Sequence, residues 1–134
     1  MGINFLAVLV AVIAASIFGM IWYSPVLFRT HWMHLMGTTT EEMQNHPHAK
    51  FGMIGNLLAT LIMGVVIAVL FSYANIDTPL KAISAALLIW VGIIMTFNFN
   101  EIMFGKKPKG LWLLNSFQQL FVLLIMSYII AIWH

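Results

Sequence analysis

The chain has 134 residues, a length that suits one domain, with 62% hydrophobic and 7% charged residues and a mean hydropathy of +0.97. Soluble domains carry about 25% charged residues, so a surface this poor in charge must face lipid over much of its area. The net charge of +2 comes from only six Lys and Arg and is expected to reflect membrane topology, because a nucleic-acid interface would need a basic patch on a wetted face. The absence of cysteine excludes disulfides, thiolate metal sites and thiol catalysis.

Four apolar stretches follow one another along the chain, and each is long enough to cross the hydrocarbon core, which takes about 20 residues. Their continuous apolarity predicts helices, because the strands of membrane barrels alternate apolar and polar residues. We therefore predict an all-α, membrane-embedded four-helix bundle that forms a single integral membrane domain. The predicted spans are residues 3–23, 51–73, 80–104 and 111–133.

The only long connection, residues 24–50, lies between the first two spans. Phe28, Trp32 and Leu35 recur there at helical spacing with polar residues between them, which predicts a short helix in the membrane interface, with an irregular loop as the alternative. Thr39 and Glu42 have capping-box spacing and predict one further helical turn.

The distribution of Lys and Arg predicts the orientation of the chain. The first and third connections lie on one side of the membrane and hold five of these residues, whereas the second connection holds one. We therefore predict that the first and third connections are cytoplasmic and that both termini lie outside the cytoplasm. The five residues are Arg29, Lys50, Lys106, Lys107 and Lys109, and the sixth is Lys81.

Polar residues inside the spans converge at a similar predicted depth near the cytoplasmic side. This predicted polar cluster consists of Asn56, Asn98, Asn100, Glu101, Asn115, Gln118 and Gln119. One interpretation is a hydrogen-bonded clamp between helices, and the other is a polar pocket or pathway. We expect Glu101 to turn inward and bond to Asn115 or Gln119; the alternative is that it reaches outward to the interface.

Small residues in the second span have the spacing of a helix-packing motif, at Gly55-x-x-x-Ala59 and Thr60-x-x-x-Gly64. This face predicts a close helix contact, within the chain or between copies. Trp90 lies in the middle of the third span, where we expect it to pack against a neighbouring helix or lipid.

Four histidines of the first connection are weak candidates for a metal site, because imidazole binds zinc and copper. They are His31, His34, His46 and His48. A His-x-x-His pair without cysteine lacks the spacing of a four-ligand site, so we expect these side chains to be wetted at the interface. The sequence predicts no cofactor.

Several motifs resemble the domain of unknown function 1761 family, small bacterial membrane proteins with four predicted spans. The resemblance covers nearly the whole chain and is carried by Asn4, the segment Trp22-Tyr23-Ser24-Pro25-Val26-Leu27-Phe28, Trp32, Asn98, Glu101, Phe104-Gly105-Lys106, Leu114-Asn115 and Trp133. It implies a membrane fold with no assigned reaction, in a bacterial inner membrane.

Function is predicted at the level of class. The leading hypothesis is a structural or interaction component, as a homo-oligomer or as an accessory subunit of a membrane complex. The alternative is a small transporter or channel that uses the predicted polar cluster. An enzyme is the weakest hypothesis, because no Ser/His/Asp set, intramembrane carboxylate pair or phosphate-binding loop is present. Expected partners are membrane lipid and other membrane subunits or copies, with no nucleic acid.

Overall fold

A computed structural model describes residues 3–37, 49–105 and 108–133. Over these residues the chain is helical, and four of its helices are long and apolar enough to cross a membrane. The predicted all-α membrane-embedded four-helix bundle is confirmed. The elements are α1 (Phe5–Trp22), α2 (Arg29–Met36), α4 (Ala49–Ala74), α5 (Pro79–Ile89), the π-helical turn η1 (Trp90–Ile94), α6 (Met95–Gly105) and α7 (Lys109–Ile132).

Some of the predicted features lie outside the described residues. They are the helical turn at Thr39–Glu42, the histidines His46 and His48, and the lysines Lys106 and Lys107.

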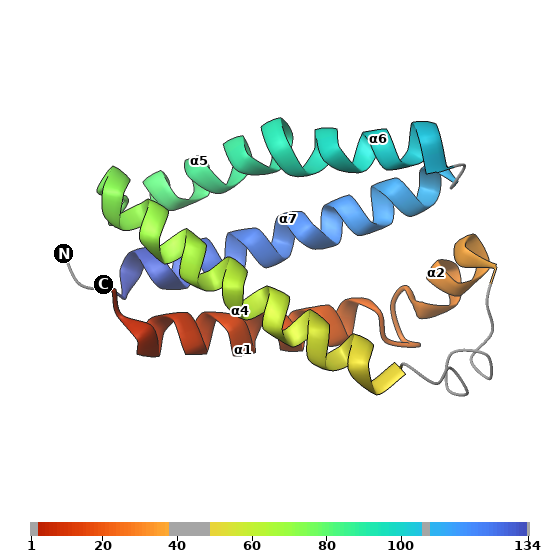
Figure 1. The fold of residues 1–134 in the computed structure, drawn as a ribbon, viewed down its shortest axis with the longest axis horizontal. Coiled ribbons are helices and arrows are strands. Elements are labelled where there is room, and N and C mark those ends of the chain that lie inside the picture. The colour runs from red at the N-terminus through yellow and green to blue at the C-terminus, as the bar shows by residue number, and fades with distance from the viewer. Residues whose placement is uncertain (1–2, 38–48, 106–107, 134) are drawn as a thin grey trace.

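Helix α7 is the centre of the bundle (Figure 1). It lies between α1 on one side and the continuous α5–η1–α6 helix on the other, while α4 crosses over α1 and α7. The side of α1 that packs against these helices is made of small residues at helical spacing, which lets the backbones approach closely. These buried residues are Ala7, Val8, Ala11, Val12 and Ala15.

The two halves of α4 differ in their surroundings. The packed half of α4, residues 64–71, buries Gly64, Ile67, Ala68 and Phe71 against the bundle. A Cβ added at Gly64 would lie 3.1 Å from methyl groups of Val12 and Met126, so α4 approaches α1 and α7 as closely there as a glycine allows.

The open half of α4, Phe51–Ala59, is exposed at every residue. Among the described residues, no atom lies within 4 Å of a Cβ built at Gly52 or Gly55. Over the residues that the structure describes, the predicted close contact of the small-residue face is therefore made at Gly64 and not at Gly55, and a contact of Gly55 between copies stays a prediction. This end of α4 diverges from α6 and α7 (Figure 1).

The predicted short helix between the first two spans is confirmed as α2. It lies at the end of the bundle beside the start of α7 (Figure 1), where Leu35 carbons lie 3.3 Å from a Cβ built at Gly110. Trp32 and Leu35 are half-buried against the bundle, whereas Thr30, His31 and His34 are exposed. The helix ends at Gly37, whose φ of 70° is in the left-handed region that glycine adopts readily.

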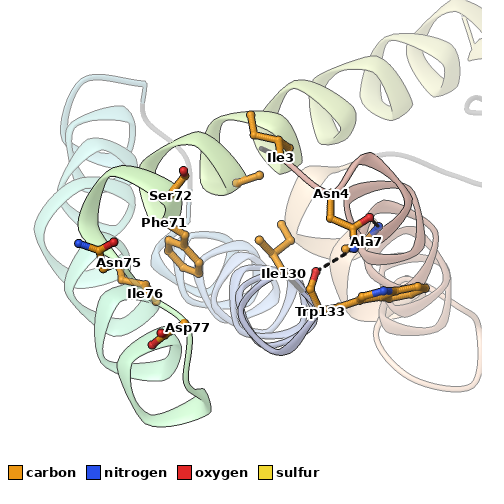
Figure 2. A pocket seen from close by; sticks show the side chains of 11 residues that line it. Ile3, Asn4, Ala7, Phe71, Ser72, Asn75, Ile76, Asp77, Ile130 and Trp133 are labelled. Atoms are coloured by element: carbon orange, nitrogen blue, oxygen red, sulfur yellow. Dashed lines mark hydrogen bonds between the residues drawn. The ribbon is translucent and has the colours of Figure 1, made fainter. Parts of the chain in front are cut away.

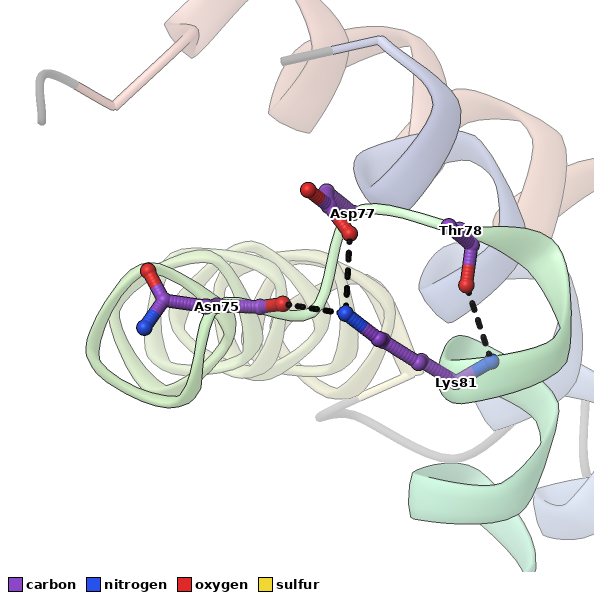
Figure 3. Close-up of polar contacts among 4 residues, drawn as sticks. All are labelled: Asn75, Asp77, Thr78 and Lys81. Carbon is purple, nitrogen blue, oxygen red and sulfur yellow. Dashed lines mark hydrogen bonds and ion pairs between the residues drawn. The ribbon is translucent and has the colours of Figure 1, made fainter.

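Both chain ends and the turn between α4 and α5 lie at the opposite end of the bundle. Asn4 accepts from the backbone N–H of Ala7 through Oδ1 at 3.2 Å and donates from Nδ2 to the carbonyl of Trp133 at 3.2 Å (Figure 2). In the turn, Lys81 pairs with Asp77 at 3.3 Å and donates to the carbonyl of Asn75 at 3.4 Å (Figure 3). These contacts fix the ends of α1, α4 and α5.

Candidate functional site

The predicted polar cluster divides into residues that face other helices and residues that face outward. Asn98 on α6 and three amides on α7 are half-buried. These three are Asn115, Gln118 and Gln119. The remaining three residues are exposed, and they are Asn56, Asn100 and Glu101.

Asn98 links α6 to α7. Its Nδ2 donates to Oε1 of Gln119 at 2.6 Å and to Oγ of Ser116 at 3.3 Å. Ser116 is fully buried. It is absent from the predicted polar cluster, which was chosen from amide and charged side chains only. The available signal was its position three residues before Gln119 on α7, which places the two side chains on neighbouring parts of one face.

Trp90 reaches the same point of α7 from the π-helical turn. Its indole Nε1 donates to the backbone carbonyl of Ser116 at 2.6 Å, and its ring lies 5.7 Å from that of Phe117. The prediction that Trp90 packs against a neighbouring helix is confirmed. We call Trp90, Asn98, Ser116 and Gln119 the α6–α7 clamp.

The π-helical turn explains how Trp90 and Asn98 both face α7. In a regular α-helix each residue turns by about 100°, so residues eight apart point about 80° away from each other. A π-helical turn inserts one extra residue into the repeat, which brings the two directions to within about 20°. The extra residue in η1 therefore aligns the two halves of the third span on α7.

A second link joins α7 to the end of α1. The hydroxyl of Tyr23, which directly follows α1, donates to Oδ1 of Asn115 at 2.7 Å. Burial raises the pKa of Tyr23 from 10.0 to about 12. With either value the phenol is protonated at neutral pH and can donate this bond. Nearby, Nε2 of Gln118 lies 3.3 Å from the position that a Cβ at Gly19 would take, so the glycine leaves room for this amide.

The inward orientation expected for Glu101 is wrong. Asn98, one turn earlier, occupies the acceptor oxygen of Gln119, while Glu101 is exposed. The reason is direction around the helix axis, because Asn98 faces α7 and Glu101, three residues later, points about 60° away from it. Glu101 lies one turn before the end of α6 at Gly105, where an exposed carboxylate can reach headgroups or water without an inward partner.

The two histidines within the described residues, His31 and His34, are exposed on α2. Over the described ranges, no three or more His, Asp or Glu side chains lie close enough together to hold a metal ion. The hydrogen-bonding groups that do come together are amides, hydroxyls and indole N–H groups, which suit helix association.

A small cavity of about 60 Å³ lies at the opposite end of the bundle, beside the chain ends (Figure 2). Its polar lining comes from Asn4, Ser72, Asn75 and Asp77. A volume of this size has room for a few water molecules, each needing at least 10–15 Å³ of accessible volume. The cavity and the α6–α7 clamp are therefore separate features at different depths.

Four apolar helices joined by interhelical hydrogen bonds define a small multi-pass membrane protein. The chain belongs to the family described as protein of unknown function (DUF1761), whose family model matches residues 6–131. The resemblance found in the sequence is thus confirmed. No curated protein and no solved structure matches this chain.

Residues that carry the family resemblance meet in pairs in the structure. Asn4 bonds to Trp133, and Tyr23 bonds to Asn115. The ring of Tyr23 also meets the edge of Trp32 at 6.0 Å between centroids. The two hydrogen-bonded pairs join segments that are far apart in the chain, so these motif residues hold α1 to the last part of the chain at both of its ends.

Proposed function

We propose that the protein is a structural or interaction component of the membrane that associates with other helices through the open half of α4. The observation that supports this proposal is the exposure of all nine residues from Phe51 to Ala59 in a helix of 26 residues. Association as a homo-oligomer is the form we test, and an accessory subunit of a larger complex would use the same surface.

The small residues of the open half lie on a side of α4 that the bundle does not use. At about 100° per residue, Gly52, Gly55, Asn56 and Ala59 fall within one sector of about 100°. The buried side of the packed half is centred about 120° away around the helix axis. We call this sector the small-residue stripe. Within the described part of the chain it is exposed, so another helix can pack on it while α4 remains packed on α1 and α7.

The glycines of this small-residue stripe lower the stability of the helix, with no compensating contact if they only face lipid. A glycine inside a helix costs roughly 0.5–1 kcal/mol relative to alanine, and close backbone packing is a common reason to keep one in a membrane helix. Gly64 has such a contact within the chain, whereas Gly52 and Gly55 have none with the described residues. Asn56 adds an amide that can hydrogen-bond across a helix pair, worth about 0.6 kcal/mol.

The test is the mass of the purified protein in nanodiscs or mild detergent, by light scattering and native mass spectrometry. We expect the wild type to be oligomeric and Gly55→Leu to shift it to monomer, since the added side chain separates the backbones. Ile54→Phe adds bulk on the opposite side of the same half and should leave the mass unchanged. A monomeric wild type, or an unchanged mass for Gly55→Leu, contradicts the proposal.

The alternative function, a small transporter or channel, requires a polar path. Asn98, Ser116 and Gln119 bond to one another, and Asn115 bonds to Tyr23, so these groups are engaged in joining helices. The cavity of about 60 Å³ lies at the other end of the bundle. These contacts favour the interaction role over transport.

We further propose that the membrane is a cytoplasmic membrane and that both termini face away from the cytoplasm, on the distribution of Lys and Arg. The chain has no cysteine, so single cysteines at Asn75 and Lys109 can be labelled with an impermeant reagent in intact cells. Labelling at Asn75 alone supports this orientation, and labelling at Lys109 alone reverses it.

A further inference from the structure

Arg29 is the first residue of α2 and is held at the end of α1. Its Nε donates to the backbone carbonyl of Tyr23 at 3.0 Å, and the side chain is half-buried. This bond uses one of the five N–H donors of the guanidinium and fixes the position of the others. The charge is thus placed at a defined level of the bundle and does not depend on a flexible side chain.

From the length of α1 we infer that this level is the edge of the hydrocarbon. Helix α1 has 18 residues and a length of about 27 Å, close to the roughly 30 Å thickness of the hydrocarbon core. The start of α1 is level with Trp133, which directly follows α7, and the end of α1 is level with Asn115 of α7. Residues 109–114 of α7 extend about 9 Å further, at 1.5 Å per residue, and α2 packs beside them.

An apolar turn stands next to this arginine. Pro25, Val26 and Leu27 connect α1 to α2 and are exposed, with 89% of Val26 accessible. An apolar tip beside a cation at the edge of the hydrocarbon is the arrangement by which interfacial segments bind lipid, with the apolar side chains among acyl chains and the cation at the headgroups.

We propose that Arg29 and the turn Pro25–Leu27 form a binding site for the headgroup of an anionic phospholipid. The guanidinium presents paired N–H groups that match two phosphate oxygens, which an ammonium cannot do. The charge of α2 agrees with an anionic ligand, since the helix carries Arg29, His31 and His34 and no carboxylate. The acyl chains of the lipid then pack against Val26 and Leu27.

The experiment titrates the full-length protein in detergent with phosphatidylglycerol and counts bound lipid by native mass spectrometry. We expect Arg29→Gln to weaken phosphatidylglycerol binding at least fivefold. Arg29→Lys should bind with an affinity between those of Arg29→Gln and the wild type, because lysine keeps the positive charge but lacks the paired N–H groups of the guanidinium. Lys109→Gln removes an exposed cation at the same end and should change the affinity less than twofold.

Three outcomes overturn the proposal. They are unchanged phosphatidylglycerol binding by Arg29→Gln, equal affinity for phosphatidylcholine, and equal protection against thermal unfolding by glycerol phosphate, which would identify the ligand as a free phosphate. Should Arg29→Gln fail to fold, Val26→Ser carries the same test, since this side chain is almost fully exposed. We expect it to weaken phosphatidylglycerol binding, and unchanged binding contradicts the site.

Discussion

The packed and open halves of α4 belong to one continuous helix of similar composition and yet have different surroundings. In the packed half, Gly64 meets Val8, Val12 and Met126 at 3.1–3.2 Å from a Cβ position, and Phe71 is 4% exposed. In the open half, Gly55 meets no described atom within 4 Å. The same residue type therefore serves the fold at one position and is available for association at another, and only the position of α4 on the bundle distinguishes the two.

The largest expected effect comes from removing a ring in the packed half. Phe71→Ala should lower the free energy of unfolding by roughly 3 kcal/mol, because the cavity left behind cannot close fully. Leu57→Ala in the open half should change it by less than about 0.5 kcal/mol, since that side chain is exposed. Denaturant unfolding in detergent measures both, and equal losses would show that the halves do not differ.

An intermediate effect, opposite in sign between the halves, is expected for glycine to alanine. Gly64→Ala should cost about 1–2 kcal/mol, because its methyl group meets the stiff β-branched side chains of Val8 and Val12. Gly55→Ala should stabilise the monomer by up to about 1 kcal/mol, because alanine favours helix and meets no neighbour within the described chain. Thermal unfolding at low protein concentration distinguishes these signs; destabilisation by Gly55→Ala would reveal an intrachain contact there.

The smallest effect separates a paired amide from an exposed one. Asn98→Leu removes the bonds to Ser116 and Gln119 and should cost about 1 kcal/mol, within the range measured for such bonds in membrane proteins. Asn56→Leu should leave the monomer unchanged, because its exposed side chain has no partner among the described residues. A loss of monomer stability for Asn56→Leu as large as that for Asn98→Leu would show an intrachain partner and remove Asn56 from the proposed association surface.

The sequence predicted the architecture well, since apolar runs of this length have few other solutions and the spacing of Phe28, Trp32 and Leu35 marks a short helix. Part of the site was also predictable, because Asn98 and Gln119 face each other. The orientation of Glu101 was not predictable in this way. Asn98 and Glu101 are three residues apart and point about 60° away from each other around the axis of α6, so only one of them need face α7.

Two further features of the site have no simple signal in a single sequence. The π-helical turn at Trp90–Ile94 shifts the face of the third span by one residue, and no residue pattern in that stretch announces it. The depth of the polar residues depends on α1 ending at Trp22, level with Asn115, which is a relation between helices distant in the chain. Both are consequences of packing rather than of local preference.

The hydrogen bond between Asn4 and Trp133 has a consequence for building larger assemblies. Because the first helix begins and the last helix ends side by side at one end of the bundle, the end of one copy can be fused to the start of the next by a linker that stays on one side of the bilayer. A tandem of two, three or four copies then has a fixed stoichiometry. Comparing the mass of such tandems with that of the free chain would count the subunits of the proposed homo-oligomer.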